Sequence, residues 1–145
     1  MTIRHVILLA MAATLGAAAS SSAQHLGGHS PGVTPTIIDE RDLLPLPGTR
    51  ERLTQLVFDK RTTVDPHTHP GAEVGTVTKG TLLVKVADGA CARYTEGQMF
   101  VVAPNTMMTV TNATDQPATL MSLVIGFPPG HHIDYVNAQP CPARP

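Results

Sequence analysis

The sequence predicts an all-β protein whose single domain folds into a closed or nearly closed antiparallel barrel. Valine and threonine are frequent, and the apolar runs are short and end at glycine or proline, which favours many short strands. A chain of 145 residues supplies one core and not two. An open sheet exposes its two edge strands, so a set of many short strands favours closing the sheet into a barrel.

The first 23 residues predict a secretory signal peptide. A basic start is followed by an apolar run from Val6 to Ala19 and by small residues that end at Ala23. Cleavage after Ala23 would release a chain that begins at Gln24, in the periplasm or outside the cell and free of the membrane. The alternative is an uncleaved membrane anchor, for which the apolar run is short.

The remaining residues divide into three parts. Residues 24–49 are expected to form a mobile leader and a first edge strand, residues 50–127 the barrel core, and residues 128–145 a proline-rich tail. Two strand-like runs flank Lys79-Gly80, a turn that predicts a hairpin between them. Strands are expected over residues 34–38, 50–59, 73–78, 81–87, 93–96, 98–103, 106–111 and 118–125.

The charge of the chain excludes one class of partner. The formal net charge is −1 and the lysines and arginines do not cluster, so no nucleic-acid partner is expected.

Cys91 and Cys141 are the only cysteines, and an oxidising compartment would permit a disulfide between them. Such a bridge would close a loop of roughly 50 residues and stabilise the fold by about 4 kcal/mol. Free thiols and a link between subunits are the alternatives.

One stretch carries the chemistry, His67-Thr68-His69-Pro70-Gly71-Ala72-Glu73. In an extended strand His67 and His69 project to the same side about 7 Å apart, and Glu73 keeps the same parity. Two neutral imidazoles and one carboxylate on one face would bind one transition-metal ion, such as copper, iron, manganese, zinc or nickel. The alternative is a pair of exposed loop histidines beside a Pro-Gly turn.

The residues around this stretch resemble the first motif of a small single-domain cupin. That motif is a glycine, five residues, HxH, three or four residues, a glutamate, six residues and a glycine. His67, His69, Glu73 and Gly80 match this spacing, and Arg61 stands at the position of the leading glycine.

The second cupin motif is present in a degraded form. It consists of a glycine, five residues, PxG, two residues, a histidine, three residues and an asparagine. Gly97 and Asn112 match its ends. Between them Ala103 and Asn105 replace the proline and the glycine, and Met108 stands at the histidine. The resemblance covers about residues 50–127.

The resemblance implies an antiparallel jelly-roll β-barrel with a metal ion near its mouth. The ligands would be His67, His69 and Glu73, with a fourth ligand from position 108. Met108 offers a soft thioether, which binds Cu(I) readily and hard divalent ions poorly. Three roles of Met108 follow from this. It is a ligand that favours copper, or it does not bind the metal and leaves a three-ligand site with open positions. In the third case it is a core side chain in a barrel with little or no metal.

The implied metal site admits three functions. The first is an exported metal-dependent enzyme, an oxygenase or isomerase, that binds a small oxygen-bearing substrate at the barrel mouth. The second is a non-catalytic periplasmic copper-binding protein, and the third is a metal-free barrel that binds a small molecule. Cupins support many chemistries, so the fold does not choose among these functions. The resemblance also implies a homodimer formed through edge strands. His131 and His132 are interpreted as a solvated pair, with one of them near the site as the alternative.

Overall fold

A computed structural model describes residues 30–143, which form ten β-strands. The predicted signal peptide and residues 24–29 of the expected leader lie outside the described residues. Within the described range, no helix could cross a membrane. The strands are β1 (Val33–Asp42), β2 (Arg50–Phe58), β3 (Thr63–Thr68), β4 (Ala72–Lys79), β5 (Thr81–Val86), β6 (Ala92–Thr95), β7 (Met99–Val102), β8 (Met108–Thr111), β9 (Ala118–Phe127) and β10 (Asp134–Tyr135).

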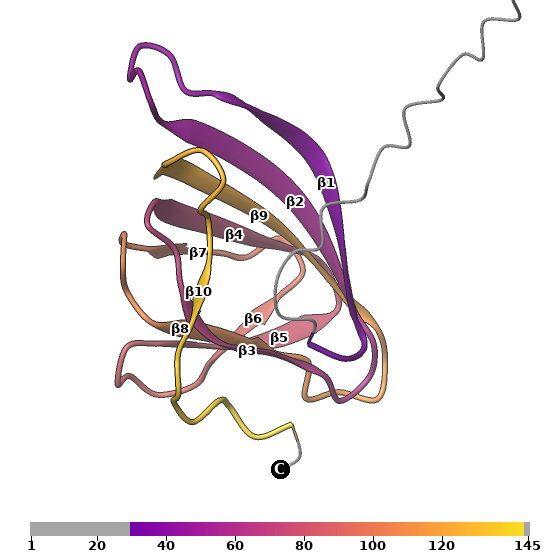
Figure 1. Ribbon diagram of the computed structural model, residues 1–145. Coiled ribbons are helices and arrows are strands. Elements are labelled where there is room, and N and C mark those ends of the chain that lie inside the picture. The colour runs from indigo at the N-terminus through magenta and orange to yellow at the C-terminus, as the bar shows by residue number, and fades with distance from the viewer. Residues whose placement is uncertain (1–29, 144–145) are drawn as a thin grey trace, which may run out of the picture.

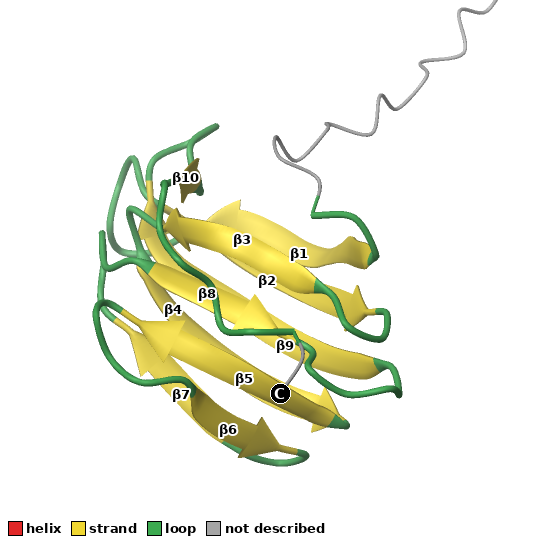
Figure 2. Ribbon diagram, turned by 90° about the horizontal axis from the view of Figure 1, so that it is seen from below, coloured by secondary structure: helices red, strands yellow, loops and turns green. Residues whose placement is uncertain are grey.

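The strands form two five-stranded antiparallel sheets. The first sheet has the order β1-β2-β9-β4-β7 and the second the order β10-β3-β8-β5-β6. The two sheets face each other across the interior (Figure 1), and seen from below the second sheet lies in front of the first (Figure 2). The chain crosses repeatedly between the sheets, so the predicted all-β jelly-roll fold is confirmed.

Alternation along the strands decides which side chains enter the interior. In β4, Glu73, Gly75 and Val77 are buried, and the residues between them are more exposed. The interior therefore receives one polar group from a strand that is otherwise apolar or small on this face. The buried apolar side chains between the sheets are Phe58, Val64, Val77, Leu82, Val84, Phe100, Val102, Met108, Val110, Ala118 and Leu120.

The predicted hairpin around Lys79-Gly80 is wrong. β4 pairs with β7 and β9, whereas β5 pairs with β6 and β8, so the two strands lie in opposite sheets. Gly80 has a φ of +79°, which glycine adopts without a steric penalty, and it turns the chain from one sheet into the other. The turn residues indicate where the chain reverses, but barrel closure decides the partner of each strand.

A β-bulge in β3 directs both histidines into the interior. Val64 pairs with Val110 and His67 pairs with Met108, so three steps along β3 match two steps along β8. The extra residue shifts the alternation, and His67 and His69 are buried at odd positions although Val64 is buried at an even one. Without this shift the two imidazoles would face solvent.

Two residues that replace motif glycines adopt the backbone conformation that glycine favours. Arg61 has a φ of +60° and Asn105 a φ of +56°. Arg61 is held by a two-pronged ion pair with Asp115 and by a hydrogen bond to the carbonyl of Ala113. The backbone N–H of Asn105 donates to the carbonyl of His69 at 2.7 Å. The turn geometry is thus kept although both glycines are absent.

Substitution at Asn105 tests the role of this backbone conformation. Asn105→Val places a β-branched side chain in the left-handed region and is expected to lower the free energy of unfolding by about 1–2 kcal/mol. Asn105→Gly relieves the conformation and should stay within about 0.5 kcal/mol of the wild type. Urea denaturation measures both variants. Equal losses in the two variants would show that the asparagine side chain matters and the backbone conformation does not.

Candidate metal centre

His67, His69 and Glu73 meet in the interior of the barrel. Only 4%, 9% and 3% of these residues is exposed, so the alternative of two exposed loop histidines is wrong. One potential ligand atom from each residue lies within 4.8 Å of the other two. Bonds of about 2.0–2.2 Å to a metal place neighbouring donor atoms about 3–4 Å apart. Small side-chain rotations would bring the three donor atoms to this spacing.

The position of Glu73 beside the two histidines does not follow from the alternation of side chains along one strand. His67 and His69 point to the same side as predicted, but the chain then bends at Pro70-Gly71 and β4 lies in the opposite sheet. Gly71 permits this crossing because a Cβ atom there would lie 2.3 Å from the carbonyl oxygen of Ile125. The carboxylate therefore approaches the imidazoles from the sheet opposite to theirs.

Two backbone carbonyls orient the imidazoles. His67 Nδ1 lies 2.7 Å from the carbonyl oxygen of Asp65, and His69 Nδ1 is bonded to the carbonyl oxygen of His132. A carbonyl oxygen can only accept, so each Nδ1 carries a proton and donates it. In the neutral imidazole this leaves the Nε2 lone pair free for a metal, which is the usual arrangement of a metal-binding histidine.

Glu73 is held in place, but one of its oxygens is not satisfied. Ser122 Oγ donates to Glu73 Oε1 at 2.6 Å. Glu73 Oε2 lies 3.2 Å from His69 Nε2, an ion-pair distance, yet it accepts no hydrogen bond from a described residue. A buried carboxylate oxygen without a hydrogen bond costs free energy unless a cation compensates it.

The three side chains set one another's protonation. Burial lowers the pKa of His67, and the neighbouring His69 lowers it further. Burial alone would lower the pKa of His69, but the Glu73 carboxylate outweighs burial and raises it. Burial alone would raise the pKa of Glu73, but its contact with His69 and the hydrogen bond from Ser122 lower it. Glu73 is thus ionised at neutral pH, as a metal ligand must be.

Met108 lies where the sequence places it, beside His67. It is fully buried, it pairs with His67 across β3 and β8, and it lines the same cavity as His67, His69 and Glu73. The thioether therefore faces the three predicted ligands and not the outside of the barrel.

The C-terminal segment, residues 128–143, completes one side of the site. Its strand β10 pairs with β3, which sets Tyr135 opposite His67, and Figure 1 shows the segment running along the barrel from one sheet towards the other. A disulfide joins Cys141 to Cys91 with their Cα atoms 5.9 Å apart. Of the three arrangements left open for the cysteines, the structure shows the intramolecular bridge.

One histidine of the adjacent pair belongs to the site. His132 lines the cavity, and burial together with the positive charge of Arg52 lowers its pKa to about 4. His131 is exposed and lies 2.8 Å from Asp134. The interpretation of a solvated pair is therefore wrong for His132, because β10 holds this part of the tail against β3.

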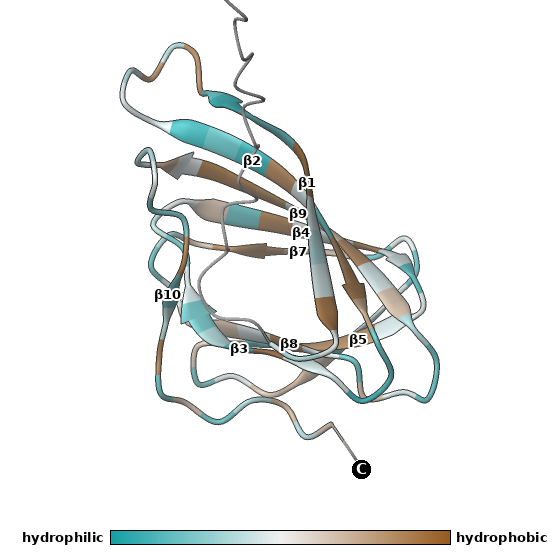
Figure 3. Cartoon of the chain, turned by 45° about the vertical axis from the view of Figure 1, so that its right-hand side comes forward, coloured by the Kyte–Doolittle hydropathy of each residue, from teal (hydrophilic) through white to brown (hydrophobic). Residues whose placement is uncertain are grey.

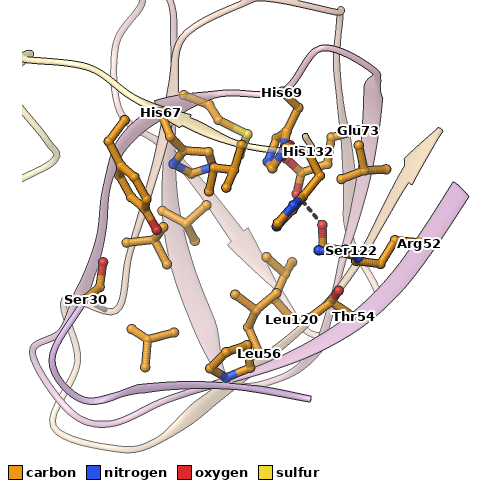
Figure 4. A pocket seen from close by; sticks show the side chains of 18 of the residues that line it. Ser30, Arg52, Thr54, Leu56, His67, His69, Glu73, Leu120, Ser122 and His132 are labelled. Atoms are coloured by element: carbon orange, nitrogen blue, oxygen red, sulfur yellow. Dashed lines mark hydrogen bonds and ion pairs between the residues drawn. The ribbon is translucent and has the colours of Figure 1, made fainter. Parts of the chain in front are cut away.

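The predicted ligands line one cavity of about 100 Å³. Figure 4 shows Ser122, Arg52 and His132 around Glu73 in its wall. Sequence reasoning did not single out Arg52 or Ser122. They lie in β2 and β9, and only the sheet order β2-β9-β4 brings them to Glu73, so no local spacing marks them.

Reduction of the disulfide tests how the C-terminal segment is held. Loss of the bridge is expected to lower the free energy of unfolding by about 2–4 kcal/mol. It should also speed hydrogen exchange at the Val136 amide, which donates to the carbonyl of Pro66. Urea denaturation and amide exchange with and without reductant measure the two effects.

The double variant of Cys91→Ser and Cys141→Ser is the control. It should match the reduced wild type and should not respond to reductant. A wild type whose stability and Val136 exchange are unchanged by reduction would show that β10 alone holds the segment.

An antiparallel two-sheet barrel with an inward-facing cluster of two histidines and one glutamate defines a class of β-barrel proteins whose interior residues are positioned for metal binding. The family model described as "Cupin domain" matches residues 55–126, a range that contains all three clustered residues and Met108. The chain belongs to the cupin family. No curated protein matches it in sequence.

Solved structures agree with this fold. An uncharacterised protein with a double-stranded β-helix domain from Klebsiella pneumoniae is 13% identical, covers 77% of this chain and 90% of its own, and has a TM-score of 0.60. KdgF from Halomonas is 21% identical over 67% of this chain and 82% of its own, with a TM-score of 0.54. At these identities the likeness concerns the fold alone.

An oxalate oxidase is more similar in sequence. It is 27% identical over 81% of this chain, with a TM-score of 0.59, and the match covers 62% of the oxidase. This chain therefore corresponds to less than two thirds of that protein.

Proposed function

We propose that this protein binds one transition-metal ion through His67, His69 and Glu73 and acts as an enzyme on a small oxygen-bearing molecule at that ion. The observation that carries the proposal is the buried cluster of His67, His69 and Glu73, whose potential ligand atoms lie within 4.8 Å of one another. A cation among the three donors would satisfy Glu73 Oε2 and both Nε2 atoms. The residues present therefore fit a metal ion.

The protein's own residues define what can occur at the site. A bound ion would supply Lewis-acid or redox chemistry, and three protein ligands leave coordination positions open. Carbonyl oxygens of Asp65 and His132 hold the imidazoles, and Ser122 holds the Glu73 carboxylate. A cavity of about 100 Å³ suits a small substrate.

The similarity to oxalate oxidase supports an enzyme. A solved oxalate oxidase that is 25% identical over 81% of this chain, with a TM-score of 0.58, holds the substrate analogue glycolate. A compound of that size suits the cavity described above. The disulfide and the signal-like residues 1–23 support export to an oxidising compartment such as the periplasm.

A second candidate function is a copper-holding protein without catalysis, and Met108 favours it. The thioether is buried against His67 and faces the same cavity. Two imidazoles, a carboxylate and a thioether would form a site that accepts Cu(I) more readily than a set without sulfur.

Metal content tests the first proposal. The full chain, secreted to a bacterial periplasm and purified there, should begin at Gln24 and hold close to one metal ion per chain by elemental analysis. Chelation should lower its melting temperature, because a ligand that binds only the folded state stabilises it. Glu73→Gln removes one donor and should abolish both the metal content and the effect of the chelator.

Glu96→Gln is the matched control, since Glu96 is an exposed glutamate outside the cavity. It should behave as the wild type does. The proposal would be contradicted if the protein held much less than one metal ion per chain and its melting temperature did not change on adding chelator. That result would favour a metal-free barrel.

Copper affinity tests whether Met108 is a ligand. Met108→Leu keeps the bulk and removes the sulfur, so Cu(I) affinity should fall roughly tenfold or more in a competition assay with a chromophoric chelator. Met108→His should shift preference from Cu(I) towards divalent ions. Met107→Leu, one residue earlier and outside the cavity, should leave Cu(I) affinity unchanged. If Met108→Leu binds Cu(I) as the wild type does, Met108 is a packing residue.

A further inference from the structure

Arg52 is a buried cation in the wall of the metal-site cavity. Only 7% of the residue is exposed, and it lines the cavity with His69 and Glu73. Its Nε and Nη2 atoms contact one oxygen of Glu40 at 2.6 and 2.5 Å. Its Nη1 atom is buried and makes no hydrogen bond to a described residue. A buried guanidinium N–H without an acceptor is costly, so a ligand oxygen that reaches Nη1 would stabilise it.

Glu40 leaves one nitrogen of Arg52 without an acceptor. The second oxygen of Glu40 lies 3.2 Å from Arg50 Nη1, and Arg50 lies also 3.7 Å from Asp42. The Arg52 guanidinium lies over the ring of Phe127, 5.6 Å from its centroid, which restricts its position. Nη1 of Arg52 therefore keeps N–H groups that Glu40 does not occupy.

The register of the first sheet sets the distance from Arg52 to the metal ligands. Arg52 pairs with Val124 of β9, and Val124 pairs with Glu73 of β4, so all three share one row and one face of the sheet. Neighbouring strands lie about 4.8 Å apart, which puts the Cα atoms of Arg52 and Glu73 roughly 10 Å apart. Figure 3 shows the hydrophilic start of β2 beside the more hydrophobic β9.

Another part of the cavity wall is apolar. It is formed by Leu56, Phe58, Val64, Val110 and Leu120. Arg52 is the only arginine or lysine among the described residues that line the cavity, so one carboxylate can pair with it. A second carboxylate would be desolvated against the apolar side chains, which is unfavourable.

We propose that the substrate is a short aliphatic monocarboxylate with an oxygen on the carbon next to its carboxylate. Nη1 of Arg52 anchors the carboxylate, and the carbon chain lies on the apolar wall. This inference rests on the proposed metal function and adds to it the charge and size of the substrate. Arg52 is in this role a specificity-determining residue that contacts the substrate and not the metal.

Calorimetric titration of the purified protein loaded with Co(II) tests the anchor, with 2-oxobutyrate as the probe. Arg52→Gln keeps a planar amide and removes the charge, so binding should weaken roughly tenfold or more. Arg93→Gln removes a charge from an exposed position outside the cavity and should change binding less than roughly threefold. In the wild type, oxalate and 2,3-pentanedione, with one negative charge more and one fewer, should each bind more weakly than 2-oxobutyrate.

Glu40→Gln keeps the test decisive if Arg52→Gln does not fold. Removing the competing carboxylate frees Arg52, so 2-oxobutyrate should bind more tightly. Equal binding by the wild type and Arg52→Gln would overturn the anchor, as would unchanged binding by Glu40→Gln. Tighter binding of oxalate or 2,3-pentanedione would overturn the single-charge preference.

Cobalt content by elemental analysis separates this inference from the proposed function. A chain that takes up no cobalt overturns both. A cobalt-loaded protein that binds the three probes alike overturns only the single-charge preference, and one that binds 2-oxobutyrate equally with and without Arg52 overturns only the role of Arg52.

Discussion

A carboxylate buried between two apolar sheets must be compensated, and the arrangement of the barrel interior follows from that requirement. Glu73 is ionised and almost inaccessible to water. Ser122 donates to one of its oxygens, and His69 lies at ion-pair distance from the other. Since an uncompensated buried charge destabilises a fold, these neighbours are required wherever Glu73 enters the core. The same requirement makes the site receptive to a cation.

The fold was predictable from local pattern because alternation and turn residues act over short distances. The edge strand, β2 and β9 were expected close to where they lie, and the barrel followed from the need to close so many short strands. Strand pairing depends on contacts between residues far apart in the chain. For this reason the turn at Gly80 was located correctly, although the hairpin inferred from it does not exist.

The candidate site was predictable to the extent that its residues are close in sequence. His67 and His69 share a side because they are two residues apart, and Met108 was identified by its place in a motif. The only sequence signal for the bulge in β3 is Pro66, because a proline inside a strand fits an edge or a bulge, and this signal does not give the register that turns both imidazoles inward. Arg52 could not be found either, because its nearness to Glu73 is produced by strand order, and a single arginine in a strand is usually a solvent-facing residue.

The disulfide couples one wall of the cavity to the redox state of the surroundings. The carbonyl that orients His69 belongs to His132, and the segment that carries it is held by the pairing of β10 with β3 and by a bond that forms only when two thiols are oxidised. Reducing conditions would therefore loosen this wall and, with it, the carbonyl that fixes the His69 imidazole.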